Sequence, residues 1–175
     1  AALVLMAGGA QATLFDRGEG FIYDDVLDIT WAQAGNINGF DTWDNQMAWV
    51  ADYTQSHSLY GVIDDWRLPT SLQPDPSCGI QIAGPPASSY GSGCTGGEMA
   101  HLVNVDSNQY ATGAGTFATA VSPLINNGYW TGTYWLASPN QAVSNGYGSG
   151  GWTSLPRDET DLLAALAVRD GDIAI

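Results

Sequence analysis

Short apolar clusters, broken by acidic and glycine-rich turns, run along most of the chain. Residues 21–23 and 28–33 flank an acidic turn and have the aromatic and β-branched content that is typical of strands. Residues 128–138 carry another strand pattern rich in aromatic side chains, and the glycines of residues 140–154 predict a hairpin or a glycine loop. The small side chains of residues 162–175 predict a final, closely packed strand.

Two stretches show helical periodicity instead. Apolar side chains recur at helical spacing in residues 41–55, where either Asp41 or Thr42 can cap the first turn. A second helix is predicted after Thr95 and Glu98, whose spacing is that of a capping box. Two helices among short, mixed antiparallel strands and long irregular loops indicate an α+β fold.

The charge of the chain restricts its partners. It contains no lysine and four arginines against 18 acidic residues, which gives a net charge of −14. Such a surface repels nucleic-acid phosphates and anionic lipids, so we expect neither as a partner. It attracts divalent cations, and hard oxygen ligands suit calcium. The candidate calcium ligands are Asp24, Asp25 and Asp28, and no other cofactor is expected.

The first twelve residues are apolar and end in Ala10-Gln11-Ala12, which is typical of the end of a secretory signal. They predict export, and the alternative is an ordinary buried strand. If residues 1–12 are retained, we expect them to pack against another subunit. No other stretch is long and apolar enough to span a membrane. Residues 13–175 are predicted to form a single domain that is extracellular or at the cell surface.

Cys78 and Cys94 are the two cysteines of the chain. In an exported protein they are predicted to form a disulfide that staples the loop of residues 71–94. The chain-entropy model gives such a bond, closing roughly 17 residues, a stabilisation of about 3 kcal/mol. A zinc site is not expected, because zinc takes four ligands and neither His57 nor His101 has suitable spacing.

The segment DDWRLPT, residues 64–70, combines acids, a tryptophan, an arginine and a proline. Pro69 excludes helical geometry at Leu68, so the segment is extended or turning. We expect Trp66 and Leu68 to be buried and Arg67 to pair with a carboxylate or with backbone carbonyls. The alternative is that Arg67 binds an anionic ligand.

Five motifs occur in order along the chain: LDITWAQ, DWRLPT, GGEMAHL, YWLAS and LAVRDGD. As a set, over about residues 14–172, they resemble a bacterial family of unknown function that includes the C-terminal domain of a collagen-like adhesin. The resemblance implies a C-type-lectin-like fold. Similar proteins are exported with a PEP-CTERM sorting tail, which would begin where this sequence stops; either processing or truncation would remove it. The residues that we expect to be structural are Trp31, Trp66, Arg67, Leu68, Pro69, Trp135 and Arg169.

The family is also similar to formylglycine-generating enzymes, which share an RLP corner and depend on a copper-binding pair of cysteines. Cys78 and Cys94 lie in a loop where that family does not have its active cysteines. Lectin-type calcium triplets are imitated by residues 73–75 (QPD) and 43–45 (WDN), but their order along the chain is reversed. Neither an oxidase nor a lectin calcium site is therefore the leading hypothesis.

A group of aromatic residues lies among glycines and is a candidate ligand or assembly face, although core packing is the more common role of such side chains. These residues are Tyr129, Trp130, Tyr134, Tyr147 and Trp152. The leading hypothesis is a non-enzymatic, exported protein of the cell surface or extracellular matrix. It would act in adhesion or self-assembly, as a homo-oligomer or fibre subunit. The alternatives are a glycan-binding lectin-like module and, less favoured, a formylglycine-generating-enzyme-like oxidase.

Overall fold

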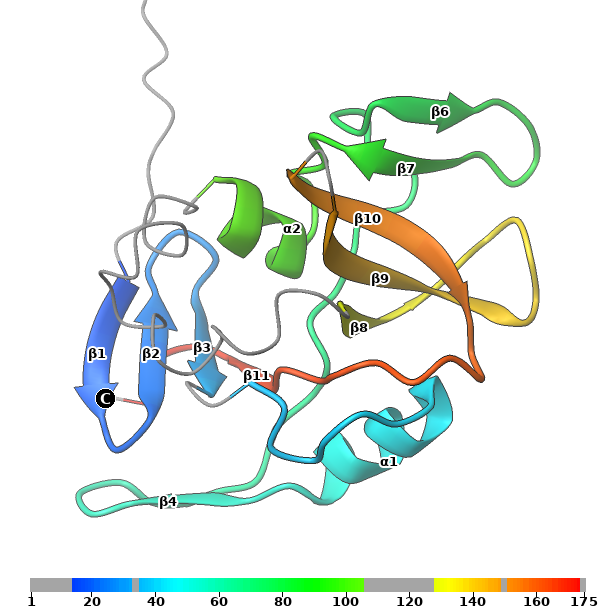
Figure 1. Cartoon of the computed structure of the whole chain (residues 1–175). Coiled ribbons are helices and arrows are strands. Elements are labelled where there is room, and N and C mark those ends of the chain that lie inside the picture. The colour runs from blue at the N-terminus through cyan, green and yellow to red at the C-terminus, as the bar shows by residue number, and fades with distance from the viewer. Residues whose placement is uncertain (1–13, 33–34, 106–127, 149–150, 174–175) are drawn as a thin grey trace, which may run out of the picture.

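The computed structural model describes residues 14–32, 35–105, 128–148 and 151–173 (Figure 1). Within these residues the chain forms two helices and eleven strands, and the strands pair in three antiparallel sheets. The predicted mixed α+β class is thus confirmed. Neither of the two described helices has the length and apolarity needed to cross a membrane.

The first sheet joins the beginning of the described chain to its end. Its strand order is β1-β2-β3-β11, with β1 at Leu14–Gly18, β2 at Phe21–Asp24, β3 at Ile29–Ala32 and β11 at Val168–Asp170. β2 and β3 flank the acidic turn, as the sequence predicts. Trp31 pairs with Ile22 on one side and with Val168 on the other, and all three side chains are buried.

The second sheet has five strands and lies beside the first (Figure 1). Its order is β6-β7-β10-β9-β8, with β6 at Ile80–Ile82, β7 at Ser88–Ser92, β10 at Gly151–Asp158, β9 at Gln141–Gly148 and β8 at Tyr129–Tyr134. β9 and β10 pair residue by residue along their whole length. The predicted hairpin is therefore confirmed.

A small two-stranded sheet projects from the lower part of Figure 1, where β4 (Gln55–His57) pairs with β5 (Gly61–Ile63). It rests on the turn between β1 and β2. The buried ring of His57 contacts Phe21 and bonds the carbonyl of Arg17 through Nε2. Glu19 accepts hydrogen bonds from the backbone and the hydroxyl of Ser58.

The two predicted helices are present as α1 (Trp43–Asp52) and α2 (Glu98–Asn104). Thr42 stands at the N-cap of α1, but its side chain does not bond the first turn. The predicted capping box of α2 is wrong, because the N-cap is Gly97 and no side chain caps it. The carboxylate of Glu98 is instead bound by groups far away in sequence.

Both helices cover buried apolar side chains between the sheets. Met99, Leu102 and Val103 of α2 pack against the first sheet around Trp31. The core beside α1 gathers aromatic and small residues from both sheets, and its members include Phe21, Trp43, Trp66, Trp130 and Ala167. Trp135 is also buried and packs edge-on against Tyr90.

Candidate functional site

The DDWRLPT segment is a corner at which three elements meet. The backbone of Arg67 bonds that of Val168 in both directions, at 2.8 and 2.9 Å. Its guanidinium donates two parallel hydrogen bonds of 2.7 Å to Glu98 and another of 2.5 Å to Asp170. Glu98 also accepts from the backbone of Thr70 at 2.7 Å. A planar guanidinium fork is suited to this bidentate pairing, which ties the corner to α2 and β11.

The apolar members of the corner lie inside the protein. Trp66 and Leu68 are buried, and the indole of Trp66 donates to the carbonyl of Ile63 at 3.1 Å. The carbonyl of Pro69 accepts a 2.8 Å bond from the backbone of Gly132 in β8. The corner therefore also holds the second sheet.

Two more arginines make similar long-range pairs. Arg169 donates two bonds of 2.7 and 2.8 Å to Asp65, 104 residues earlier in the chain. Arg17 donates to both carboxylate oxygens of Asp172, 155 residues later, and lies over two aromatic rings of β1 and β2. Ion pairs therefore hold β11 and the residues that follow it, through Arg67 and Asp65 of the corner and Arg17 of β1.

These pairs keep their groups charged. Hydrogen bonding to Glu98 raises the pKa of Arg67 against the opposing effect of burial, and Asp170 adds to the rise. Hydrogen bonding from Arg169 lowers the pKa of Asp65. The donors of Arg67 are occupied by carboxylates of its own chain, which is the arrangement of a structural corner rather than an anion-binding site.

Gly97 allows α2 to approach the corner closely. A Cβ on Gly97 would lie 2.6 Å from the Cα of Ser71 and 2.8 Å from the carbonyl oxygen of Thr70. We expect Gly97→Ala to destabilise the chain by about 2 kcal/mol, because backbone atoms would have to move. Gly132→Ala is the matched control, since its Cβ would meet nothing closer than 3.6 Å. Equal unfolding midpoints in urea for the two variants would contradict this expectation.

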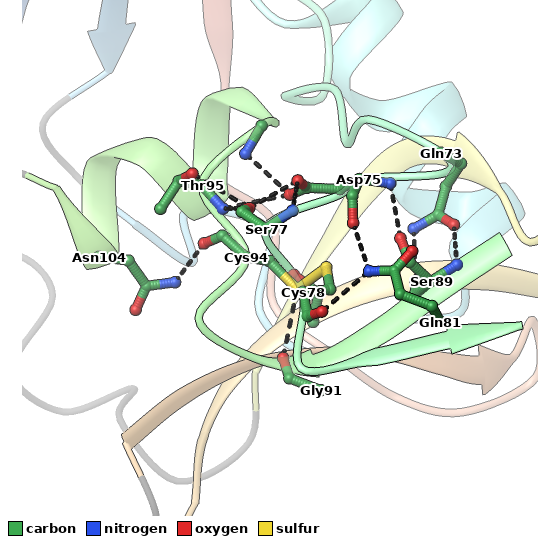
Figure 2. Close-up of a disulfide and its surroundings, with 12 residues drawn as sticks. Gln73, Asp75, Ser77, Cys78, Gln81, Ser89, Gly91, Cys94, Thr95 and Asn104 are labelled. Carbon is green, nitrogen blue, oxygen red and sulfur yellow. Dashed lines mark hydrogen bonds between the residues drawn. A yellow bond between two sulfur atoms is a disulfide. The ribbon is translucent and has the colours of Figure 1, made fainter.

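A second cluster closes the loop that carries β6 and β7, and Figure 2 shows its side chains. The buried carboxylate of Asp75 accepts hydrogen bonds from the backbone and hydroxyl of Ser77, at 2.9 and 2.6 Å. Its other oxygen accepts from the backbone of Thr95 at 3.1 Å and of Gly96 at 2.8 Å. One carboxylate therefore joins both ends of the loop.

The predicted disulfide between Cys78 and Cys94 is confirmed and lies beside this carboxylate (Figure 2). Among the described residues, Asp75 and the two sulfurs are the group of acidic, cysteine and histidine side chains whose ligand atoms lie within 4.8 Å of one another. Because the sulfurs are bonded to each other and the carboxylate accepts four hydrogen bonds, this arrangement is a clamp rather than a metal centre. We call Asp75 and the disulfide together the loop clamp.

The loop clamp is expected to be sensitive to acid. Burial opposes ionisation of Asp75, but hydrogen bonds from Ser77, Gly96 and Thr95 outweigh it and lower its pKa. A folded pKa below the unfolded value of about 3.9 stabilises the fold above that pH, and the stabilisation is lost as the pH falls through the folded pKa. The free energy of unfolding of the wild type, measured in urea, should thus exceed that of Asp75→Asn at neutral pH by a margin that shrinks below about pH 4. A margin independent of pH would contradict this assignment.

The candidate calcium ligands lie on or next to the turn between β2 and β3. Asp24 is buried, and its Oδ1 accepts two backbone hydrogen bonds within the turn. Asp28 accepts a 2.9 Å bond from the hydroxyl of Tyr23. Asp24, Asp25 and Asp28 do not bring three ligand atoms within 4.8 Å of one another. Calcium binding at this turn stays a prediction.

The predicted aromatic face is wrong for two of its five members. Tyr129 and Trp130 are fully buried, because β8 lies between β9 and the segment that leads to β11. Burial also raises the pKa of Tyr129. Tyr134 is 53% exposed, at the far end of β8. The side chains of Tyr147 and Trp152 lie outside the described part of the chain, although their backbones pair between β9 and β10.

Charge is distributed unevenly over the sheets. Residues 76–97 and 107–156 contain no aspartate, glutamate, lysine or arginine, so every formal charge lies elsewhere in the sequence. The uncharged stretches include all of β6, β7, β8 and β9, together with β10 as far as Pro156. We call these strands together the uncharged sheet. It carries exposed isoleucines at Ile80 and Ile82.

Comparison with known proteins adds no family to this picture. No protein-family model matches the chain, and neither a curated protein nor a solved structure is significantly similar to it.

Proposed function

We propose that this chain is a non-enzymatic, exported domain that acts by contact with other molecules, in adhesion or in self-assembly at the cell surface or in the extracellular matrix. The observation that carries the proposal is the uncharged sheet. A chain with a net charge of −14 repels most macromolecular surfaces of the same sign. The uncharged sheet, with its exposed apolar side chains, is a surface at which another molecule can bind without electrostatic repulsion.

The finer fold and the location belong to the same proposal. The ordered set of motifs, from LDITWAQ to LAVRDGD, supports a C-type-lectin-like fold by its resemblance to the adhesin-related family. The Cys78–Cys94 disulfide supports export, because such bonds persist in oxidising compartments. The oxidase alternative requires these cysteines as free thiols, and here they are bonded to each other.

The ion-paired arginines support a contact function as well. The guanidiniums of Arg17, Arg67 and Arg169 each hold carboxylates of distant segments. The scaffold is thereby fixed by its own polar groups, and the outer faces are left to meet partners.

The proposal is tested with the purified full chain. Negative-stain electron microscopy and sedimentation velocity over a range of concentrations should reveal oligomers or filaments, and retention on immobilised matrix polymers or cells should report adhesion. We expect at least one of these contacts. A chain that stays monomeric at every concentration and is retained on no surface would overturn the proposal.

A further inference from the structure

We infer that strand β6 is a self-association edge, at which two copies of this chain pair antiparallel to form one continuous sheet. The inference rests on the proposed function and names the partner as a second copy. Sheet edges present unpaired backbone N–H and C=O groups and are ready templates for such pairing. The two larger sheets have four edge strands among the described residues: β1, β11, β8 and β6.

Three of these edges are covered or protected. β8 is covered, since its backbone bonds the carbonyls of Ala164 and Pro69. β11 is covered by its two backbone bonds with Arg67. β1 carries the charged residues Asp16 and Arg17 and an irregular register, both of which discourage pairing with another chain.

β6 lacks these protections in the described part of the chain. It pairs only with β7, and no described strand lies on its outer side. Ile80 and Ile82 are 44% and 39% exposed. Gln81 is held by its own loop, because its side-chain amide donates to the carbonyls of Asp75 and Cys78. The strand therefore offers an outer side with no described strand partner and two partly exposed β-branched apolar side chains.

The charge distribution indicates why the occupant is a second copy. Residues 76–97 carry no formal charge and neither do residues 107–156, whereas all 18 acidic residues lie in the rest of the sequence. Two copies that meet through β6 keep their acidic parts apart, while contact through the first sheet or the helices, which carry acidic residues, brings carboxylates together. A basic partner would instead be attracted to the acidic part. Pairing about a two-fold axis also makes β6 its own complement.

Screening of the residual repulsion gives the pairing a distinct salt dependence. The Debye length falls from about 10 Å at 0.1 M salt to about 3 Å at 1 M. Association through an uncharged edge should therefore tighten as salt is added to the full chain. An ion-paired interface would weaken under the same conditions.

Sedimentation velocity of the full chain and of Ile82→Glu tests the assignment. A carboxylate facing its own copy across a sheet edge should weaken dimerisation about tenfold or more. Val62→Glu is the matched control, since it adds the same charge at a 65% exposed position on the short strand β5. We expect the control to dimerise as the wild type does, and near-ultraviolet circular dichroism checks that both variants are folded.

The outcomes separate this inference from the proposed function. Loss of dimerisation in Ile82→Glu alone supports the β6 edge. Equal self-association of all three proteins overturns the edge and leaves self-assembly standing. A wild type that is monomeric at all salt concentrations also overturns the edge, and retention on matrix polymers or cells then decides the proposed function. A variant without residues 1–12 should dimerise normally; loss of its dimers would overturn β6–β6 pairing in favour of the apolar segment as the contact.

Discussion

Replacement of Arg67 with methionine should lower the free energy of unfolding by about 3 kcal/mol, because removing one partner leaves the other charges of a partly buried network uncompensated. Glu98 would lose two hydrogen bonds, and its side chain is only 15% exposed. Asp170 would remain nearby as a like charge. Urea denaturation at neutral pH, followed by fluorescence of the buried tryptophans, measures the loss.

Two variants control this measurement. Arg157→Met removes a solvent-exposed pair with Asp161 at 3.9 Å, and we expect a change below about 0.5 kcal/mol. Arg67→Lys keeps the charge but not the planar fork, so its stability should lie between those of wild type and Arg67→Met. A loss for Arg67→Met no larger than that for Arg157→Met would mean that the corner is not held by this arginine.

Removal of the disulfide by Cys78→Ala together with Cys94→Ala should cost about 3 kcal/mol, because the unfolded chain gains the entropy of an open loop. The two cysteines are 16 residues apart. The folded loop should nevertheless stay closed, since Asp75 bonds both of its ends. Hydrogen exchange of the β6 and β7 amides reports the closure.

Adding Asp75→Asn to the cysteine variants separates the two halves of the loop clamp. We expect the β6 and β7 amides to exchange quickly only in the triple variant, while either half alone keeps them protected. Asp41→Asn is a control carboxylate, since Asp41 bonds Asn45 and Thr42 far from this loop. Fast exchange in the cysteine double variant would contradict a closing role for Asp75.

Local patterns predicted much of the fold. Trp43, Met47 and Val50 recur at helical spacing, and α1 begins at Trp43. The acidic turn and the glycines of residues 140–154 likewise predict strand pairs that the structure contains. These features depend on neighbours in sequence, where spacing and turn residues decide the outcome.

The errors come from contacts between distant segments. Glu98 has the spacing of a capping residue, but a bidentate bond to Arg67 engages its carboxylate more strongly than a local cap does. Tyr129 and Trp130 stand near glycines that suggest exposure, yet a strand-like segment ending in β11 covers them. No local sequence pattern predicts either of these two long-range contacts.

The loop clamp and the uncharged sheet differ in how far the sequence alone predicts them. Asp75 accepts hydrogen bonds from the backbone amides of Thr95 and Gly96, which follow Cys94. These contacts exist only in the closed loop, so the sequence alone does not reveal them. The charge-free residues 76–97 and 107–156 can be read directly from the sequence. What the sequence does not give is that these stretches form neighbouring strands of one sheet with an open edge.

The ion pair between Arg17 and Asp172 has a consequence for biosynthesis. It joins residues that are 155 positions apart in the sequence. The first sheet is likewise incomplete until β11 pairs with β3. Contacts of such long range slow folding, because a large loop must close before they form. A nascent chain therefore cannot complete its first sheet until β11 has been synthesised, and β1, β2 and β3 lack their final strand partner until then.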